Sequence, residues 1–273
     1  MIKIAVTSGK GGVGKSTVAA NLALALSKKY KTGLLDVDIH GPSIPKMMGL
    51  DKVRGVSESK EEGKMEPVIF KNLRVFSIGF LLPSSDTPVV WRGPMKHGFI
   101  KQAYEQVNWD VDYLVIDHPP GTGDEAISVM QLVKPDVVVT VTTPQSVAFE
   151  EVKKTINFVI QTGEAKGEEK GDGQKEASEE PEKTAPVIGL VENMSGLICP
   201  HCSQVIDVFG AGGGKKLAEE MNIPFMGSIP LNPQVSDSGE KGKPIVETDE
   251  KIAEIFDTII DFIIEKAEKE VTA

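Results

Sequence analysis

The chain has 273 residues, of which 40% are hydrophobic and 26% are charged, a composition typical of a folded globular protein. Its formal net charge of −10 argues against sequence-independent binding to nucleic-acid phosphates, which requires a basic surface. No apolar run approaches the ~18 residues of a membrane span, and the first residues lack the pattern of an export signal. Two cysteines cannot form a disulfide framework, so we expect thiols in a reducing, cytoplasmic compartment.

Short apolar runs alternate with amphipathic stretches along the chain. The runs expected to form strands are 2–7, 33–38, 73–78, 113–117, 137–141, 187–191 and 224–229. Apolar residues recur at helical spacing in 16–27, 150–160 and 251–266, and a further helix is expected at 215–221. Strands that are apolar on both faces and alternate with helices predict an α/β protein with a mainly parallel sheet flanked by helices.

The segment 163–186 has a different composition from the rest of the chain. It contains eight acidic and four basic residues, and neither an aromatic nor a branched aliphatic side chain. Such a segment cannot bury enough apolar surface to offset the entropy lost on ordering. Because strand and helix patterns resume on both sides, we predict a disordered surface insert within a single domain that spans residues 1–273.

A glycine-rich loop follows the first predicted strand and leads into the first predicted helix. It matches the phosphate-loop pattern G-x-x-x-x-G-K-[ST], with the residues Gly9, Lys10, Gly11, Gly12, Val13, Gly14, Lys15 and Ser16. Glycines let backbone N–H groups wrap phosphates, and the helix N-terminus adds partial positive charge. Lys15 is expected on the β- and γ-phosphates, and the Ser16 hydroxyl on Mg²⁺.

The same loop also satisfies the dinucleotide-binding pattern G-x-G-x-x-G, and Asp36 lies about 20 residues further on, as that pattern requires. The consecutive Lys15 and Ser16 favour the phosphate loop, because a dinucleotide fold has no role for this pair at the helix start. Lys10 has two interpretations. It is either a solvated surface lysine or a lysine that reaches a partner subunit's nucleotide and stabilises transition-state charge.

Carboxylates end two of the predicted strands. Asp117 closes the run 113–117, and an acid at the carboxyl end of a parallel strand lies beside the ligand crevice, so it suits the Walker-B role on Mg²⁺. Gly121 and Gly123 would let the following loop respond to the γ-phosphate. Asp36 and Asp38 are both expected on the strand 33–38, facing one side, with one orienting water and the other binding Mg²⁺ or capping a loop.

Both cysteines lie in the motif Cys199-Pro200-His201-Cys202. One hypothesis is a thiol–disulfide motif, with the pKa of Cys199 lowered at a helix start. The other is half of a four-thiolate site for Zn²⁺ or a [4Fe–4S] cluster, completed by the two cysteines of a second copy in a symmetric dimer. His201 is a candidate for a third zinc ligand, although a surface position is more common for such a residue.

Taken together, these stretches resemble the Mrp/ApbC-type iron–sulfur cluster carrier ATPases, deviant Walker A P-loop NTPases related to MinD and to the nitrogenase iron protein. The motifs occur in the family's order along nearly the whole chain: GKGGVGKST (9–17), DVDIHGPSIP (36–45), WRGPM (91–95), DHPPGTGD (117–124), TTPQ (142–145), VENMSG (191–196), CPHC (199–202) and GGG (212–214). The resemblance implies a homodimer that binds ATP between subunits and carries a bridging [4Fe–4S] cluster to recipient apoproteins, without nucleic acid or membrane as partner.

The resemblance also implies roles for individual residues. Lys10 would be the signature lysine, Thr17 would contact the α-phosphate and Asp38 would act on the attacking water. Asn193 would contact the adenine, and the two cysteines of the motif would bind the cluster. The alternative is a MinD-like ATP-dependent positioning switch, which would carry a basic membrane-targeting helix at its C-terminus; the residues 265–270 have mixed charge instead.

Two features depart from the family's pattern: the acidic insert 163–186 is not among its motifs, and His118 is polar where an apolar residue is expected. The sequence also shows no N-terminal cysteine-rich segment of the kind found in the eukaryotic cytosolic scaffold relatives, so we do not expect a second, stable cluster.

Overall fold

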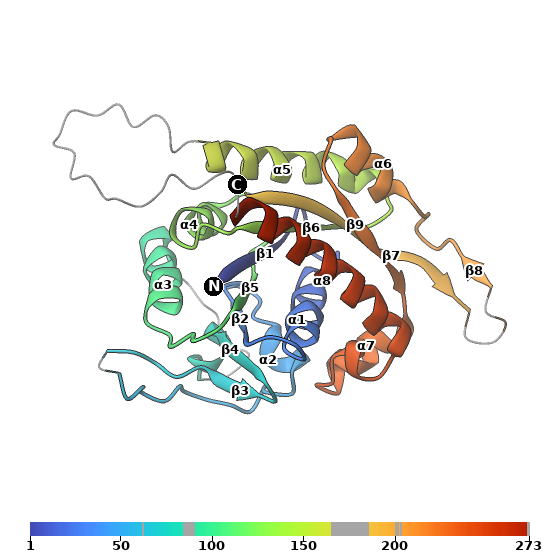
Figure 1. The fold of residues 1–273 in the computed structure, drawn as a ribbon. Coiled ribbons are helices and arrows are strands. Elements are labelled where there is room, and N and C mark those ends of the chain that lie inside the picture. The colour runs from blue at the N-terminus through green and yellow to red at the C-terminus, as the bar shows by residue number, and fades with distance from the viewer. Residues whose placement is uncertain (62, 84–90, 165–185, 200–201, 203, 272–273) are drawn as a thin grey trace, which may run out of the picture.

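The computed structural model describes residues 1–61, 63–83, 91–164, 186–199, 202 and 204–271. A nine-stranded sheet lies at its centre, in the order β3-β4-β2-β5-β1-β6-β7-β8, with β9 paired to β7 (Figure 1). All described pairings are parallel except β3 with β4 and β7 with β8, which confirms the predicted mainly parallel sheet. The strands are β1 (Ile2–Ser8), β2 (Thr32–Asp36), β3 (Val68–Phe70), β4 (Leu73–Ser77), β5 (Tyr113–Asp117), β6 (Val137–Thr142), β7 (Val187–Ile198), β8 (Val205–Ile206) and β9 (Phe225–Leu231).

Helices cover both faces of the sheet. On one face α1 contacts β1, β2 and β5, and α8 packs on α1 and β9; on the other, α4 lies between α3 and α5, and α6 contacts β7 (Figure 1). The helices are α1 (Lys15–Leu26), α2 (Ile44–Met47), α3 (Gly93–Glu105), α4 (Asp124–Leu132), α5 (Phe149–Glu164), α6 (Gly213–Glu220), α7 (Pro233–Glu240) and α8 (Glu250–Val271).

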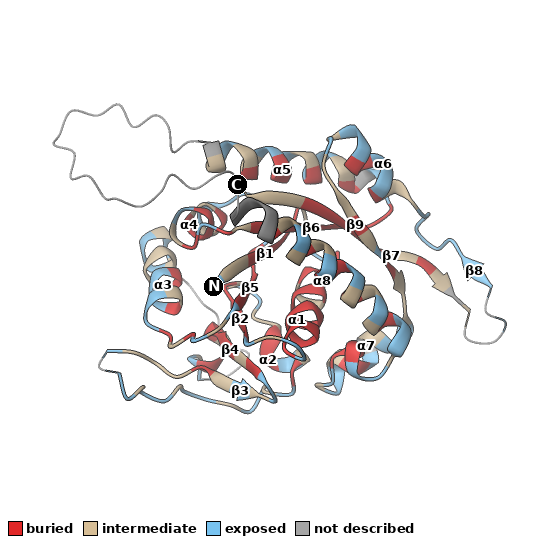
Figure 2. Ribbon diagram, viewed as in Figure 1, coloured by how far each residue is buried: buried red, intermediate tan, exposed pale blue. Residues whose placement is uncertain are grey.

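Side-chain alternation along the central strands builds a core on each face. In β1, Ile4 and Val6 join the core beneath α1 and α8, whereas Ala5 faces the opposite layer. In β2, Leu34 and Leu35 divide in the same way. The helix α1 is buried nearly all round, because it lies between the sheet and α8 (Figure 2). This burial fixes the helix whose first residue is Lys15.

Several predicted boundaries are wrong. The strand expected at 33–38 ends at Asp36, so Asp38 lies in the following loop. The strand expected at 187–191 continues to Ile198, and α5 runs to Glu164, into the start of the predicted insert. The rest of that insert, residues 165–185, falls outside the described part of the chain.

The strand order places three strand ends side by side. In the order β2-β5-β1, Asp36 pairs in register with Asp117, and Asp117 pairs with Val6, two residues before the end of β1. Ligands of such sheets bind beyond the carboxyl ends of the strands, where the order of the connections reverses. The loop after β1 is therefore held next to the acids that end β2 and β5.

Candidate functional site

Two glycines of the loop after β1, Gly9 and Gly14, are required by their neighbours. Gly14 has φ +86°, and a Cβ on it would come within 2.2 Å of the Asn193 Nδ2 atom. A Cβ on Gly9 would lie 2.6 Å from the backbone carbonyl carbon of Glu151 in α5. Side chains do not fit at either position, so glycine lets this loop run close to β7 and α5.

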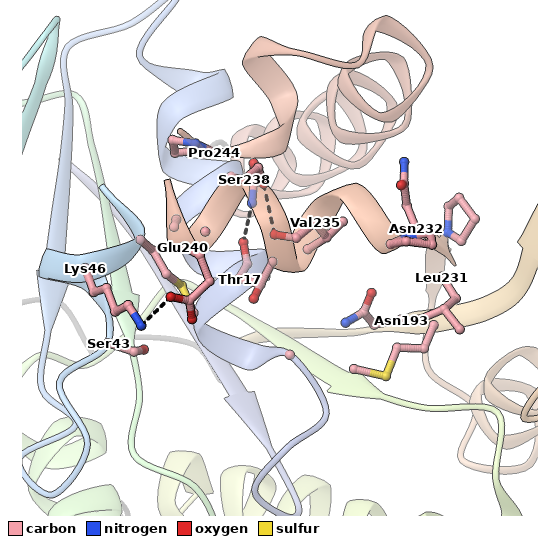
Figure 3. A pocket seen from close by; sticks show the side chains of 18 residues that line it. Thr17, Ser43, Lys46, Asn193, Leu231, Asn232, Val235, Ser238, Glu240 and Pro244 are labelled. Atoms are coloured by element: carbon pink, nitrogen blue, oxygen red, sulfur yellow. Dashed lines mark hydrogen bonds and ion pairs between the residues drawn. The ribbon is translucent and has the colours of Figure 1, made fainter. Parts of the chain in front are cut away.

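Two adjoining cavities open along this loop. The smaller, of about 190 Å³, is lined by Ser8, Lys10, Gly11, Gly12, Gly14, Lys15, Ser16, Thr17, Asp38, Ser43, Met47 and Pro120. The larger, of about 510 Å³, shares Gly14, Thr17, Ser43 and Met47 with it and extends to Asn193 and α7. In Figure 3, Lys46 and Glu240, joined by an ion pair of 2.7 Å, lie at one side of the larger cavity and Asn193 at the other.

Lys15 is the centre of a buried charge cluster. Its Nζ lies 2.6 Å from Asp117 Oδ1 and 3.8 Å from Asp38 Oδ2, and it donates to Ser16 Oγ at 3.2 Å. Burial by itself lowers the pKa of Lys15, but the negative charges of Asp117 and Asp38 outweigh it, so the pKa is raised. Lys15 is therefore held in its charged form at the floor of the smaller cavity.

The cluster holds more carboxylates than cations. Burial raises the pKa of Asp117, and the charge of Lys15 only partly offsets this. Burial, and then the charge of Asp117, raise the pKa of Asp36 well above its usual range. Asp117 Oδ2 is buried without a hydrogen-bond partner among the described residues. A carboxylate oxygen left open beside a hydroxyl and an excess of acids fits a hard divalent cation such as Mg²⁺.

Asp36 and Asp38 do not share a strand, contrary to the expectation from the sequence. The Asp36 carboxylate is fully buried and accepts hydrogen bonds from Ser77 Oγ at 2.8 Å and from the Asp38 backbone N–H at 3.1 Å. These bonds end β2 and turn the chain, because the side chain of Asp36 binds the backbone two residues on. Asp38 is thereby placed in the loop, where it lines the smaller cavity.

His118 lies directly after Asp117 and is 2% exposed. Its Nδ1 donates to the Pro119 carbonyl oxygen at 2.9 Å and lies 3.4 Å from Thr7 Oγ1. Its Nε2 has no hydrogen-bond partner within the described part of the chain. Burial lowers the pKa of His118 to about 4, so the ring is neutral at physiological pH and binds the loop after β5 through Nδ1.

The remaining predicted nucleotide residues line the cavities from different elements. Asn193, on β7, donates from Nδ2 to the Val13 carbonyl oxygen at 2.9 Å, so β7 is bonded to the phosphate loop itself. Thr17 lines both cavities from the first turn of α1. Lys10 is half-buried and lines the smaller cavity of its own chain.

The two cysteines lie away from these cavities, at the turn between β7 and β8. This hairpin projects from the body of the molecule (Figure 1). Cys199 is half-buried and its backbone N–H donates to the Gln204 carbonyl oxygen at 2.9 Å, while Cys202 is exposed. The helix start expected for Cys199 in the redox hypothesis is wrong, because the bond from Cys199 to Gln204 continues the antiparallel pairing of β7 with β8. His201 lies outside the described residues.

The part of the larger cavity that follows β9 was not predicted from the sequence. Asn232, Val235, Ser238 and Glu240 line it from α7 and the residue preceding that helix. A signal was present, because β9 was predicted as a strand of a parallel sheet, and the segment after its carboxyl end belongs to the ligand-binding edge. Within the described residues, no helix is long and apolar enough to cross a bilayer.

Phosphate loops at the carboxyl edge of a mostly parallel sheet define the P-loop NTPases, and this chain is a P-loop NTPase. It matches the model of the NUBPL iron-transfer P-loop NTPases over residues 1–165 and 171–264. The chain therefore belongs to the NUBPL iron-transfer P-loop NTPase family.

Similar proteins agree with this assignment. Over 271 residues the chain is 43% identical to the iron–sulfur cluster carrier protein of Methanocaldococcus jannaschii, covering 97% of this chain and 85% of the relative. Over 245 residues it is 48% identical to the cytosolic Fe–S cluster assembly factor NUBP2 homolog of Dictyostelium discoideum, covering 88% of this chain and 84% of that relative. A nucleotide-binding protein of Archaeoglobus fulgidus, solved in complex with ADP, matches with a TM-score of 0.71 and 37% identity over 89% of this chain and 86% of that chain.

These findings confirm the resemblance to iron–sulfur cluster carriers of the P-loop class. They support an Fe–S carrier role and nucleotide hydrolysis for this chain in general terms.

Burial of His118 predicts a loss of stability in acid. The unfolded chain binds a proton on this histidine below about pH 6.5, whereas the folded chain does so only below about pH 4. The free energy of unfolding should therefore be insensitive to this group above pH 6.5 and fall by up to about 1.4 kcal/mol per pH unit between these values. Urea unfolding of the wild type and of His118→Asn, from pH 4 to pH 8, measures the difference.

The variant is chosen because the Asn amide can still donate to the Pro119 carbonyl oxygen but does not titrate. Its unfolding free energy should run parallel to that of the wild type above pH 6.5 and fall less steeply below. Equal slopes in the acid range would contradict the assignment of this proton uptake to His118.

Proposed function

We propose that this protein is an ATPase that holds a [4Fe–4S] cluster between two copies of the chain and transfers it to recipient apoproteins. The observation that carries the proposal is that β7 bonds to the phosphate loop at Asn193 and ends at the C-x-x-C turn. One strand therefore joins a nucleotide-sized pair of cavities to a pair of thiols. The names of the relatives, which refer to iron–sulfur cluster transport and assembly, support the cargo.

In this proposal ATP lies along the two adjoining cavities. The triphosphate occupies the smaller cavity, where Lys15 exchanges Asp117 for phosphate oxygens and Thr17 contacts the α-phosphate. The nucleoside occupies the larger cavity, where the Asn193 Oδ1 atom accepts from the adenine amino group while Nδ2 keeps its bond to Val13. The ADP complex of the Archaeoglobus fulgidus protein supports an adenine nucleotide as ligand.

The acids and the loop lysine supply the hydrolytic step. Ser16 and Asp117 would hold Mg²⁺, which neutralises charge on the phosphates when it is bound. Asp38, at the wall of the smaller cavity, orients the attacking water. Lys10 acts in the second copy's site, where its charge stabilises the transition state, so hydrolysis requires the dimer. The position of Lys10, Ser16 and Asp38 around the smaller cavity supports these hydrolytic roles.

The cluster site follows from counting ligands. A [4Fe–4S] cluster takes four thiolates, and each chain has two cysteines, so two copies related by symmetry complete the set. Zn²⁺ fits the same four thiolates. The apolar residues Val205, Ile206, Val208 and Phe209 are exposed next to the motif, and exposed apolar groups of this kind support a contact with another protein surface. Relatives named as cytosolic factors support a cytoplasmic location.

Replacement of the loop lysine tests the nucleotide site. Lys15→Ala removes charge-assisted hydrogen bonds of about 1.5–3 kcal/mol, so ATP should bind roughly 10- to 150-fold more weakly. Titration calorimetry with Mg²⁺ and a non-hydrolysable ATP analogue measures the change. Lys101→Ala, at an exposed position on α3, is the matched control and should bind as the wild type does. Binding of NADH by the wild type, with no binding of ATP, would overturn the assignment.

Replacement of either cysteine tests the shared cluster. Cys199→Ser or Cys202→Ser removes two of the four thiolates at once, so iron retention after anaerobic reconstitution should be almost lost. The wild type should hold about one cluster per two chains and elute as a dimer. Asp207→Asn, an exposed change on the same hairpin, should retain its iron. A monomer with full iron content would rule out the bridging arrangement, and an intrachain disulfide without iron would favour the redox hypothesis.

A further inference from the structure

One buried carboxylate holds both ends of the segment that carries the cysteines. Glu192 on β7 is 0% exposed. Its Oε1 accepts from Ser195 Oγ at 2.5 Å and from the Gly212 N–H at 3.0 Å, and its Oε2 accepts from the Gly214 N–H at 2.5 Å. Ser195 lies on β7 before the cysteines, and Gly212 follows β8 and precedes α6. The chain segments on both sides of the cysteine hairpin are therefore bonded to a single side chain.

Where the chain returns, at Gly213 and Gly214, it is packed closely against Glu192 and Pro144. A Cβ on Gly214 would lie 3.0 Å from the Glu192 Cβ, and a Cβ on Gly213 would lie 2.4 Å from the Pro144 carbonyl oxygen. A buried carboxylate depends on its donors, since losing one leaves charge without compensation. The position of the loop 212–214 is therefore tied to that of Glu192.

The next residue along β7 is bonded to the nucleotide side. Asn193 donates to the Val13 carbonyl oxygen at 2.9 Å, and Met194 lines the larger cavity. Adjacent residues of one strand thus contact the phosphate loop and the base of the cysteine hairpin. Because the two residues share one planar peptide unit, a displacement of one moves the backbone of the other unless the flanking φ and ψ angles absorb it.

Between these contacts and the cysteines, β7 departs from regular strand geometry. Met194 has φ +59° and Gly196 has φ +68°, and the pairing with β9 shifts register between Asn193 and Leu197. Irregularities of this kind bend a strand, and left-handed backbone at a non-glycine residue is retained only where its surroundings enforce it. The hydrogen bond from the Ser195 hydroxyl to Glu192 lies within this irregular stretch and helps to hold its backbone in the left-handed conformation.

We propose that Glu192 is a positioning residue through which the nucleotide site sets the geometry of the cysteine hairpin. When a nucleotide occupies the cavity beside Asn193 and Met194, β7 adjusts, and Glu192 carries the adjustment to Ser195 and to the loop at Gly212. The inference rests on the proposed function, in which the cavity takes ATP and the hairpin takes the cluster. It adds that the thiols respond to nucleotide even when no metal is bound.

The test measures the reactivity of the thiols of the full chain, reduced and free of metal. The two cysteines are the only ones in the sequence, so iodoacetamide labelling followed by mass spectrometry reports on the hairpin alone. In the wild type, Mg²⁺ with a non-hydrolysable ATP analogue should change the labelling rate by roughly fivefold or more, the range of ordinary coupling between sites. Calorimetry under the same conditions establishes that the analogue is bound.

Glu192→Gln has one acceptor oxygen in place of two, so it cannot accept from both the Gly212 and the Gly214 N–H groups, which bond to different oxygens of Glu192. In this variant the nucleotide should bind but no longer change the labelling rate. Glu220→Gln, an exposed change at the far end of α6, is the matched control and should keep the wild-type response. A Glu192→Gln protein with the full wild-type response would overturn the proposal, as would a wild type that binds the analogue without any change in labelling.

A second measurement uses the wild type alone and does not depend on the folding of a variant. Amide hydrogen exchange at residues 204–214 should change when the analogue binds, and unchanged exchange there would overturn the coupling. Failure of the proposed function gives a different pattern. A chain that binds ATP and shows the thiol response but never retains iron would contradict the cluster site while leaving the role of Glu192 intact.

Discussion

The buried ion pair between Lys15 and Asp117 is the interaction on which the rest of the site depends. It joins the first residue of α1 to the last residue of β5 across 2.6 Å, in a place where neither charge is solvated. Isolated, either group would cost several kcal/mol to bury. The pair is therefore retained only because the sheet and α1 hold both groups in position. The neighbouring carboxylates favour a bound cation, and Lys15 is the group in the cluster that would attract a phosphate.

The parallel sheet provides this arrangement through its strand order. With β5 between β1 and β2, the phosphate loop, Asp117 and the loop carrying Asp38 meet at one edge. The second half of the chain joins them through β7, which bonds to the loop at Val13 and then extends past the sheet to the cysteines. In our proposal this strand connects the nucleotide site to the distant pair of thiols, so that the two sites work together.

Much of this arrangement can be predicted from the sequence, because it follows from local rules. Strands buried on both faces are continuous apolar runs, and the spacing of Gly14, Lys15 and Ser16 has one common structural context. Asp117 ends an apolar run, so its place at the sheet edge follows from strand length alone. The family relationship was likewise visible in the order of the motifs, and the comparisons confirm it.

Other features depend on contacts between residues far apart in the chain. From the sequence, a strand was expected to end at Val191, before the polar residues Glu192 and Asn193. In the structure β7 continues through them, because both side chains are hydrogen-bonded to distant backbone groups, those of Gly212, Gly214 and Val13. Asp38 was expected on the same strand as Asp36. That strand ends at Asp36, where the buried hydrogen bond from the Ser77 hydroxyl to the Asp36 carboxylate helps to end it. The walls of the larger cavity contributed by α7 come from a segment without a recognisable nucleotide motif.

The most direct test of the account is a crystal structure of the protein with Mg²⁺ and a non-hydrolysable ATP analogue. The account predicts that the triphosphate lies in the loop 9–16, that Lys15 Nζ has left Asp117 for the phosphate oxygens, and that Asp117 faces the Mg²⁺ ion. A nucleotide bound elsewhere, or one bound in the loop while Lys15 keeps its 2.6 Å contact with Asp117, would contradict it.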